Sequence, residues 1–474
     1  MTASIIFIPV LLVILLNIPR LSGKTAYYAA LAFFVYQLVS VFFVDAGSAQ
    51  FAQLISKWFR LNIFADGISK IMIISTAVVA FSALMTSKPF IKYDSRLFSL
   101  SNLILLAAAG INGIVFARDI FTIYVFVEVI AAASYIMIAL DKTESSLEGG
   151  FKYLMLSSIA TVMMLFAVAL FFLAAGGTGF MEISAALRNF GGNPVVLLAI
   201  MLFMSGLLIK GGLIPFHAWL PGAYSSAPAG VSVFLGGIIT KTTGIFTLIR
   251  FFYSVVGFNE NVKMVLLIIG SLSIIIGAIA AIKQKDFKKV LAYSSISQVG
   301  YIVLSLGAGT AFGVAAAVFH IFNHAIFKSL LFVNSAAIEK QTGRRDIDTF
   351  GGLGYKMPIT SVTTAIAFLS ASGIPPLSGF WSKLFIILAL WSAGYKGFAF
   401  VAVLASILTM AYFLNLQKKV FFGEISTSVE NVKEAALSFT IPQIILCAIT
   451  VLSGIGFFYI VKVLIFPSAG IIYQ

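Results

Sequence analysis

Charged residues are scarce in this chain, at 10% of the total against 60% hydrophobic residues, and the mean hydropathy is +1.06. Soluble globular domains carry about 25% charged residues, so a soluble protein is excluded. Cysteine is scarcer still, because Cys447 is the only one. A single thiol excludes disulfides, cysteine-ligated iron–sulfur clusters and zinc–thiolate sites within the chain. The sequence therefore predicts a membrane protein with no cofactor and no redox centre of its own.

The apolar residues are grouped into long runs, and no signal peptide is evident before them. At about 20 residues per transmembrane helix, they predict an all-α polytopic membrane protein with fourteen spans, the seventh and twelfth long and interrupted. The expected spans are 3–19, 25–44, 66–87, 97–117, 119–140, 152–175, 194–220, 229–250, 262–282, 288–307, 309–336, 358–392, 397–417 and 439–465. The longest loops, which leave no room for a sizeable soluble domain, are 45–65, 176–193, 337–357 and 418–438.

Lysine and arginine are distributed unevenly around these spans. Eighteen of the 31 lie in loops after odd-numbered spans, and seven lie in loops after even-numbered spans. Because basic residues stay on the cytoplasmic side, we expect both termini to lie outside. A basic cytoplasmic face explains most of the net charge of +14, so no nucleic-acid partner is needed, although this face could dock an acidic or peripheral protein.

The stretch 206–245 joins two apolar runs and places a lysine inside each, Lys210 and Lys241. A lysine at the centre of a membrane helix costs about 2.5–3.5 kcal/mol, so it usually belongs to an ion path or a buried pair. Gly212 and Pro215 interrupt the helix beside Lys210. A broken helix at membrane depth survives only where protein or water lines it, and two lysines in consecutive spans favour an ion path.

A short internal sequence repeat indicates a duplicated architecture. Residues 212–216 (Gly-Leu-Ile-Pro-Phe) resemble residues 373–377 (Gly-Ile-Pro-Pro-Leu), five spans later, and each lies near an intramembrane lysine, Lys210 or Lys383. Because the two copies are an odd number of spans apart, the second copy has the opposite orientation across the membrane. This arrangement is typical of inverted repeats with discontinuous helices at a conduction site. The alternative for Lys383 is a side chain that reaches the interface from a helix end.

Glu128 is the only carboxylate that the spans place near mid-membrane, about 13 Å along a helix from Asp119. It is most simply a counter-charge for Lys210, which would keep both groups ionised despite burial. The alternative is a buried ion pair with a purely structural role.

His320, His324 and Lys328 follow one another at intervals of four residues. They therefore form one stripe on a helix, with about 6 Å between neighbours, and water can bridge such a stripe. The histidines also have the spacing of a zinc or haem site, but no carboxylate or cysteine lies nearby in sequence to complete it. We therefore expect a relay and no metal.

Several motifs together resemble the antiporter-like membrane subunits of the complex I superfamily. They are Lys-Gly-Gly-Leu-Ile-Pro-Phe-His-Ala-Trp-Leu-Pro (210–221), Ala-Pro-Ala-Gly-Val-Ser (227–232), Tyr-Ser-Ser-Ile-Ser-Gln (293–298), His-Ile-Phe-Asn-His-Ala-Ile-Phe-Lys (320–328) and Gly-Ile-Pro-Pro-Leu-Ser-Gly-Phe (373–380). That superfamily includes pumping subunits of NADH:quinone oxidoreductases, membrane-bound hydrogenases and Mrp-type Na⁺/H⁺ antiporters. The motifs look closest to the D-type Mrp subunit and its hydrogenase relatives.

The resemblance implies a division of the chain and a role for each buried group. The parts are helices 1–3 (residues 1–96), a first five-helix repeat (97–252), a second, inverted repeat (253–417), and a C-terminal loop with helix 14 (418–474). By motif, the expected proton relay is Glu128, Lys210, Lys241, His320, His324, Lys328 and Lys383.

The function expected from the resemblance is that of a non-redox, proton-translocating subunit in a prokaryotic cell membrane, with sodium–proton exchange left open. Its partners would be other membrane subunits, including further antiporter-like ones, and peripheral redox subunits. One alternative is an autonomous carrier of a small solute built on inverted repeats; a chain of buried lysines argues against a single binding pocket. A quinone- or haem-handling oxidoreductase is a third alternative, and it lacks the expected ligands.

Overall fold

The computed structural model describes residues 2–18, 21–44, 47–48, 63–190, 192–427 and 429–466. Within these ranges the chain is all-helical apart from a two-stranded ribbon, β1 (Gly47–Ser48) and β2 (Phe64–Ala65). The predicted loop 45–65 lies almost entirely outside the described residues.

The helices follow one another through the whole described chain. They are α1 (Thr2–Asn17), α2 (Gly23–Ser40), α4 (Gly67–Ser87), α5 (Asp94–Phe116), α6 (Ile120–Ile138), α7 (Glu144–Ala175), α8 (Phe180–Phe190), α9 (Pro194–Gly211), α10 (Trp219–Ser226), α11 (Ala229–Phe234), α12 (Thr247–Phe251), α13 (Glu260–Ile282), α14 (Phe287–Leu306), α15 (Ala311–Thr342), α16 (Leu353–Lys356), α17 (Pro358–Ser372), α18 (Ser378–Ser392), α19 (Lys396–Phe421), α20 (Leu437–Ile455) and α21 (Phe457–Ile460).

Eleven helical segments in the described part are long and apolar enough to cross a membrane. The other expected spans, 3–19, 288–307 and 358–392, correspond to α1, to the more polar α14, and to the shorter helices α17 and α18. Helix α8 occupies part of the predicted loop 176–193. The chain is therefore a multi-pass membrane protein, and the count of fourteen spans stays a prediction.

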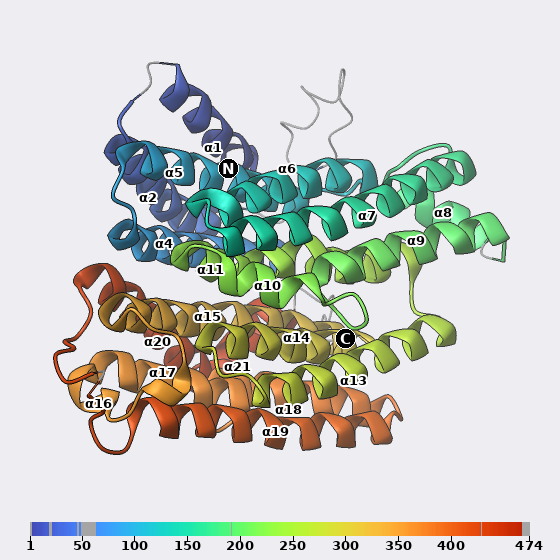
Figure 1. The fold of residues 1–474 in the computed structure, drawn as a ribbon. Helices are drawn as coiled ribbons and strands as arrows, with labels where there is room; N and C mark the ends of the chain where they lie inside the picture. Colours follow the sequence, from blue (N-terminus) through green and yellow to red (C-terminus); the bar gives the residue numbers. More distant parts are fainter. Residues whose placement is uncertain are drawn as a thin grey trace.

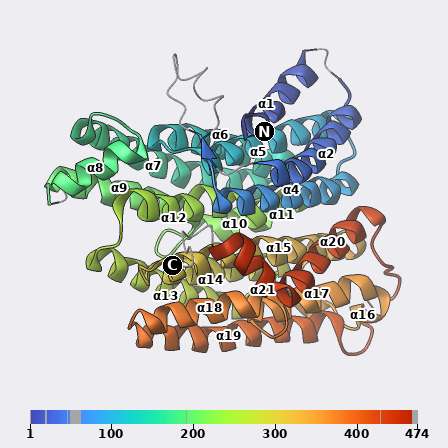
Figure 2. The same cartoon turned by 180° about the vertical axis from the view of Figure 1, so that it is seen from behind.

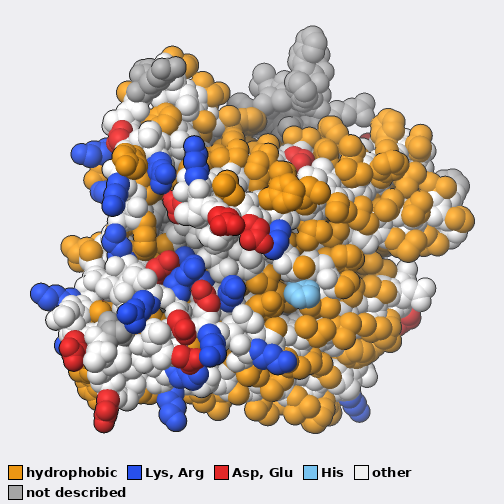
Figure 3. Space-filling view, viewed as in Figure 1, with side chains coloured by type: hydrophobic (Ala, Val, Ile, Leu, Met, Phe, Trp, Pro, Cys, Tyr) orange, Lys and Arg blue, Asp and Glu red, His pale blue; other side chains and the backbone are white. Residues whose placement is uncertain are grey.

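The long helices lie roughly parallel, with the first half of the chain stacked on the second half (Figure 1). The view from behind shows the same division, with α5, α6 and α7 on one side and α18 and α19 on the opposite side (Figure 2). Helix α15 lies between the halves, where it contacts α4 and α11. Charged side chains gather towards one end of the helices, whereas much of the remaining visible surface is hydrophobic (Figure 3).

Two helices break in the same way. Helix α9 ends before Gly212 (φ +67°), and α17 ends before Gly373 (φ +86°). In each case the amide of the next residue donates to a carbonyl five residues back: Leu213 to Leu208 (3.2 Å) and Ile374 to Leu369 (3.0 Å). Glycine suits this left-handed position because it has no Cβ. The break places α10 after α9, and α18 after α17, within the helix bundle.

The eighth expected span is not a regular α-helix. It consists of α11 and α12 joined by the wider π-helical turns Leu235–Ile239 and Lys241–Phe246, and a third such turn, Phe252–Val256, follows. The apolar window of this segment is wholly buried. Turns of this kind occur often at functional sites, and here they surround Lys241.

We expect Gly244→Ala to disturb the contact between this span and α9. A Cβ at Gly244 would lie 2.4 Å from both the Cα and the amide nitrogen of Gly211, so backbone would have to move. Overpacking of this kind costs about 1–3 kcal/mol, and thermal unfolding in detergent should show a lower midpoint. Gly222→Ala is the matched control, because nothing lies within 4 Å of its added Cβ. Equal midpoints for the two variants would contradict the close packing.

Candidate functional site

Glu128 and Lys210 form an ion pair, with 3.3 Å between Oε1 and Nζ. Glu128 comes from α6, and Lys210 lies in the last turn of α9, directly before the break. Helix α7 completes the site: Ser157 Oγ accepts from the lysine at 2.6 Å, and Thr161 Oγ1 donates to the carboxylate. The Lys210 side chain is 2% exposed, whereas that of Glu128 is 40% exposed on the outer side of the helix bundle.

Lys241 is fully buried, and its ammonium group donates to the carbonyl of Gly236. That carbonyl belongs to a π-helical turn, in which backbone hydrogen bonds join residues five positions apart instead of four. Tyr224 of α10 holds the same segment, because its hydroxyl lies 3.0 Å from the Leu235 carbonyl oxygen and 2.7 Å from Thr240 Oγ1. The irregular backbone thus supplies a polar partner for a buried cation.

The two histidines of α15 lie one turn apart, with 6.2 Å between their ring centroids. His320 contacts Ser382 Oγ through Nδ1 (2.9 Å) and Gln298 Oε1 through Nε2 (3.2 Å). Both ring nitrogens of His324 are buried without a hydrogen-bond partner in the described part of the chain. The predicted stripe exists, and it joins α14 (Gln298) to α18 (Ser382).

Two lysines lie at the ends of this region. Lys328 donates to Ser294 Oγ (2.5 Å) and to the Leu291 carbonyl (3.1 Å), both on α14. Lys383 lies over the ring of Tyr301, 4.5 Å from its centroid, and lines a cavity of about 230 Å³ between α18 and α19. Both side chains are buried, and the burial of Lys383, which is 3% exposed, contradicts the alternative in which this lysine extends to the membrane interface.

The structure brings only Glu128 and Lys210 of the predicted relay into an ion pair. Among the described residues, no hydrogen bond or ion pair joins the other relay groups to one another. The described residues also contain no group of three His, Cys, Asp or Glu side chains that could hold a metal ion.

A second buried charge cluster was missed in the sequence. The two terminal guanidinium nitrogens of Arg250 each lie 2.6 Å from a carboxylate oxygen of Asp66, and Arg118 lies 2.9 Å from the same carboxylate. Burial alone would raise the pKa of Asp66, but the two arginines outweigh it and hold that pKa well below its usual range. Burial and the neighbouring Arg250 lower the pKa of Arg118 to about 10. From the sequence, Arg118 and Arg250 had been counted as loop charges and Asp66 as the first residue of a span, with no contact expected among them.

The fold and the site define a class: a multi-pass membrane protein with broken helices and ionisable groups buried among them. The particular family follows from comparison with known proteins. The family model described as NADH:quinone oxidoreductase/Mrp antiporter, TM, matches residues 117–409. The chain belongs to this family.

Individual relatives agree with this assignment. The chain is 34% identical over 361 residues to the N subunit of the NADH-quinone oxidoreductase from Desulforudis audaxviator, covering 75% of this chain and 72% of the relative. It is 30% identical over 399 residues to the D subunit of the Na⁺/H⁺ antiporter from Alkalihalophilus pseudofirmus, covering 84% and 80%. Its fold matches a chain of the Mrp complex from Dietzia sp. DQ12-45-1b with a TM-score of 0.90, 23% identity, and coverage of 100% and 97%.

Proposed function

We propose that this chain is a proton-translocating membrane subunit of a multisubunit energy-converting complex, in which partner subunits supply redox chemistry or ion exchange. The observation that carries the proposal is the set of buried cationic and titratable side chains in successive helices, which begins at the Glu128–Lys210 ion pair. Ionisable groups inside a membrane protein usually mark an ion pathway. The relatives named as subunits of an NADH-quinone oxidoreductase and of a Na⁺/H⁺ antiporter support the same class of function.

In the proposed route, protons reach Lys210, pass Lys241 and the two histidines of α15, and leave near Lys383. Lys328 belongs to the same relay. Movement of the Glu128 carboxylate relative to Lys210 would change how strongly the lysine holds its proton, because an opposite charge at this distance favours the ammonium form.

The proposal includes fourteen spans with two inverted repeats, residues 97–252 and 253–417, flanked by residues 1–96 and 418–474. The matched breaks of α9 and α17 favour it, because each ends at a glycine with positive φ and lies close to a buried lysine. Inverted repeats with broken helices are a recurrent way to build a transport path.

Membrane partners are favoured by the surroundings of Glu128. The carboxylate is partly exposed on a face of α6 where Phe121, Val125 and Ile136 are also exposed. An ionised group in contact with lipid is costly, so another membrane protein of the complex would be expected to cover this face. We place the complex in a prokaryotic cell membrane, with both termini outside and the basic face in the cytoplasm.

An autonomous carrier of a small solute is the second candidate. The cavity beside Lys383 is the observation in its favour, since it lies next to a broken helix. Uptake of a solute by the isolated chain in liposomes would support the carrier, whereas the proposed function predicts activity only within the complex.

The proposed function is tested by His324→Ala in the intact complex. Because the ring lies between His320 and Lys328 on the stripe, its removal should interrupt the relay and lower ion translocation while the complex still assembles. The metal content of the complex should not change, because the ring is expected to carry protons and bind no metal. Unchanged pumping, or stoichiometric zinc or iron lost with the ring, would contradict the proposal.

A further inference from the structure

Helices α14 and α15 face each other through a polar seam. Several contacts cross it, among them His320 with Gln298 (3.2 Å), Lys328 with Ser294 (2.5 Å), and Glu339 with Lys288 (2.8 Å). The first two belong to the relay region described above. The third lies further along the same pair of helices, and the proposed route does not use it.

In the Lys288–Glu339 ion pair, each charge lies at the end of its helix where the helix dipole is unfavourable to it. Lys288 is the second residue of α14, near the positive end of the helix dipole, and Glu339 is in the last turn of α15, near the negative end. The lysine side chain is 3% exposed and the glutamate side chain 25%. The pair is thus a buried cation joined to a carboxylate that still reaches solvent.

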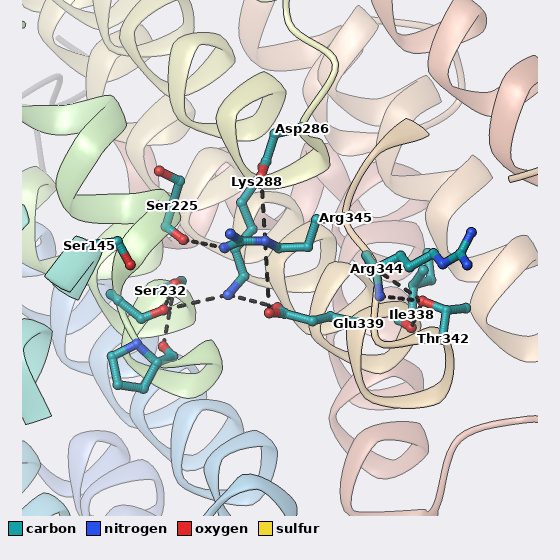
Figure 4. A network of polar contacts seen from close by, with 12 residues as sticks. Ser145, Ser225, Ser232, Asp286, Lys288, Ile338, Glu339, Thr342, Arg344 and Arg345 are labelled. Atoms are coloured by element: carbon teal, nitrogen blue, oxygen red, sulfur yellow. Dashed lines mark hydrogen bonds and ion pairs between the residues drawn. The ribbon is translucent and has the colours of Figure 1, made fainter. Parts of the chain in front are cut away.

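Figure 4 shows the charged and polar groups that surround this pair. Arg345 lies 4.0 Å from Glu339 and 3.4 Å from Asp286, and it donates to the Ser225 carbonyl at 2.7 Å. On the other side, the Ala227 carbonyl lies 3.5 Å from the Lys288 ammonium. Glu339 therefore faces two cations, and the seam ends among the charged loops of the basic face.

From Glu339 the seam leads inward to Lys328. At 100° per residue, Lys328, Ser335 and Glu339 lie within about 40° of one another around α15. The Ser335 hydroxyl is buried and makes no hydrogen bond within the described chain. On α14, the Leu291 carbonyl that binds Lys328 belongs to a residue only about 4.5 Å along the helix from Lys288. Polar groups thus lie on the same face of α15 between the surface carboxylate and the buried lysine, at distances that water molecules would have to bridge.

We propose that Glu339 is the group through which protons from the basic face reach Lys328, and that Lys288 positions it. This inference rests on the proposed function. A proton from the bulk phase binds Glu339 Oε1, since Oε2 is buried against Lys288, and protonation of the carboxyl group weakens the ion pair with Lys288. It then passes along the seam, by way of Ser335, to the unprotonated Nζ of Lys328, and the carboxylate re-forms its pair. Only bonds to the transferred proton are made and broken.

The test uses the intact complex in liposomes, with assembly and proton pumping measured separately. Glu339→Gln should assemble and lose at least about tenfold in pumping, since a positioned proton-transfer group typically contributes 10²–10⁴-fold. Formate added on the basic side should restore part of the rate, because a diffusible acid can replace the missing carboxyl. Asp348→Asn is the matched control: it breaks two ion pairs of the same face, with Lys285 and Lys419, outside the seam.

A purely structural role for the pair predicts different results. The charge-balanced variant Lys288→Met/Glu339→Gln should then pump normally, which would overturn the inference even if Glu339→Gln alone fails to assemble. A double variant that assembles, pumps poorly and responds to formate would support it. If Lys328→Met stops pumping while Glu339→Gln behaves like Asp348→Asn, only this inference fails. If Lys328→Met also pumps normally, the proposed function fails with it.

Discussion

Lys210→Met should abolish coupled ion translocation while the complex still assembles. The methionine side chain fills a similar volume but cannot hold a proton, and proton-transfer groups typically contribute about 10²–10⁴-fold to a rate. Glu128→Gln should also lower turnover, because Lys210 loses its counter-charge at 3.3 Å. Breaking a fully buried pair costs about 3–5 kcal/mol; the loss of stability should be smaller here, since Glu128 is 40% exposed.

A double-mutant cycle separates a conducting pair from a structural one. If the pair only holds the fold, each single variant should reduce assembly, and Glu128→Gln/Lys210→Met should recover it. If the pair conducts, assembly persists in all three, and pumping stays low in the double variant. Lys462→Met is the control, because it removes an exposed lysine of the last helical turn that has no place in the route. Pumping restored in the double variant would refute the conducting role.

The broken helices could be predicted from the sequence because their signals are local. Gly212 and Pro215 stand within one apolar run, and Gly373 with Pro375 stands in another. That Glu128 and Lys210 lie within long apolar helices was predictable for the same reason, since each follows from counting residues along an apolar run. Their contact follows from the packing of α6 against α7 and of α7 against α9, which the motifs indicated only through family resemblance.

The polar partners of the relay could not be predicted in this way. Ser157, Gln298 and Ser382 bind relay groups, but a serine in a membrane helix gives no distinctive signal. Ser82, for example, is also buried in a helix, and its hydroxyl donates to the carbonyl four residues earlier in the same helix. The π-helical turns around Lys241 were also missed, because the apolar pattern of that span is the same for either kind of helix.

Long-range ion pairs were the other omission. Arg250 and Asp66 are 184 residues apart in sequence, and no local pattern connects them. Arg118 and Arg250 were counted only as loop charges, so their common partner was not recognised. The structure shows that Asp66 is the N-cap of α4, while Arg250 lies in α12, in the last part of the helical segment Ala229–Val256 that contains Lys241. This cluster therefore ties the lysine-bearing span to the start of a buried helix.

Asp66→Asn should destabilise the chain more than Asp119→Asn, the same change at a neighbouring helix N-cap. Asparagine caps a helix as well as aspartate does, so the hydrogen bond to the Ser69 amide (2.9 Å) can persist. The substitution removes the negative charge that pairs with both Arg250 and Arg118. The Arg250 side chain is only 3% exposed, so water cannot replace that charge. We expect a loss of about 3 kcal/mol in the free energy of unfolding, near the low end for buried pairs because Asp66 itself is partly exposed.

The pH dependence and a matched variant make this expectation specific. Because the folded state holds the pKa of Asp66 below its usual 3.8, the stabilisation is complete at neutral pH and is lost as the pH falls below about 4 towards the lowered pKa. Thermal unfolding in detergent should therefore show a constant difference between the natural chain and Asp66→Asn above pH 5, and a shrinking one below pH 4. Asp119→Asn is the control, since Asp119 caps α6 and accepts from Thr178 but contacts no arginine through its carboxylate. If Asp119→Asn lowered stability as much as Asp66→Asn, removal of the carboxylate charge at a helix N-cap would explain both, and the arginine pair would contribute nothing.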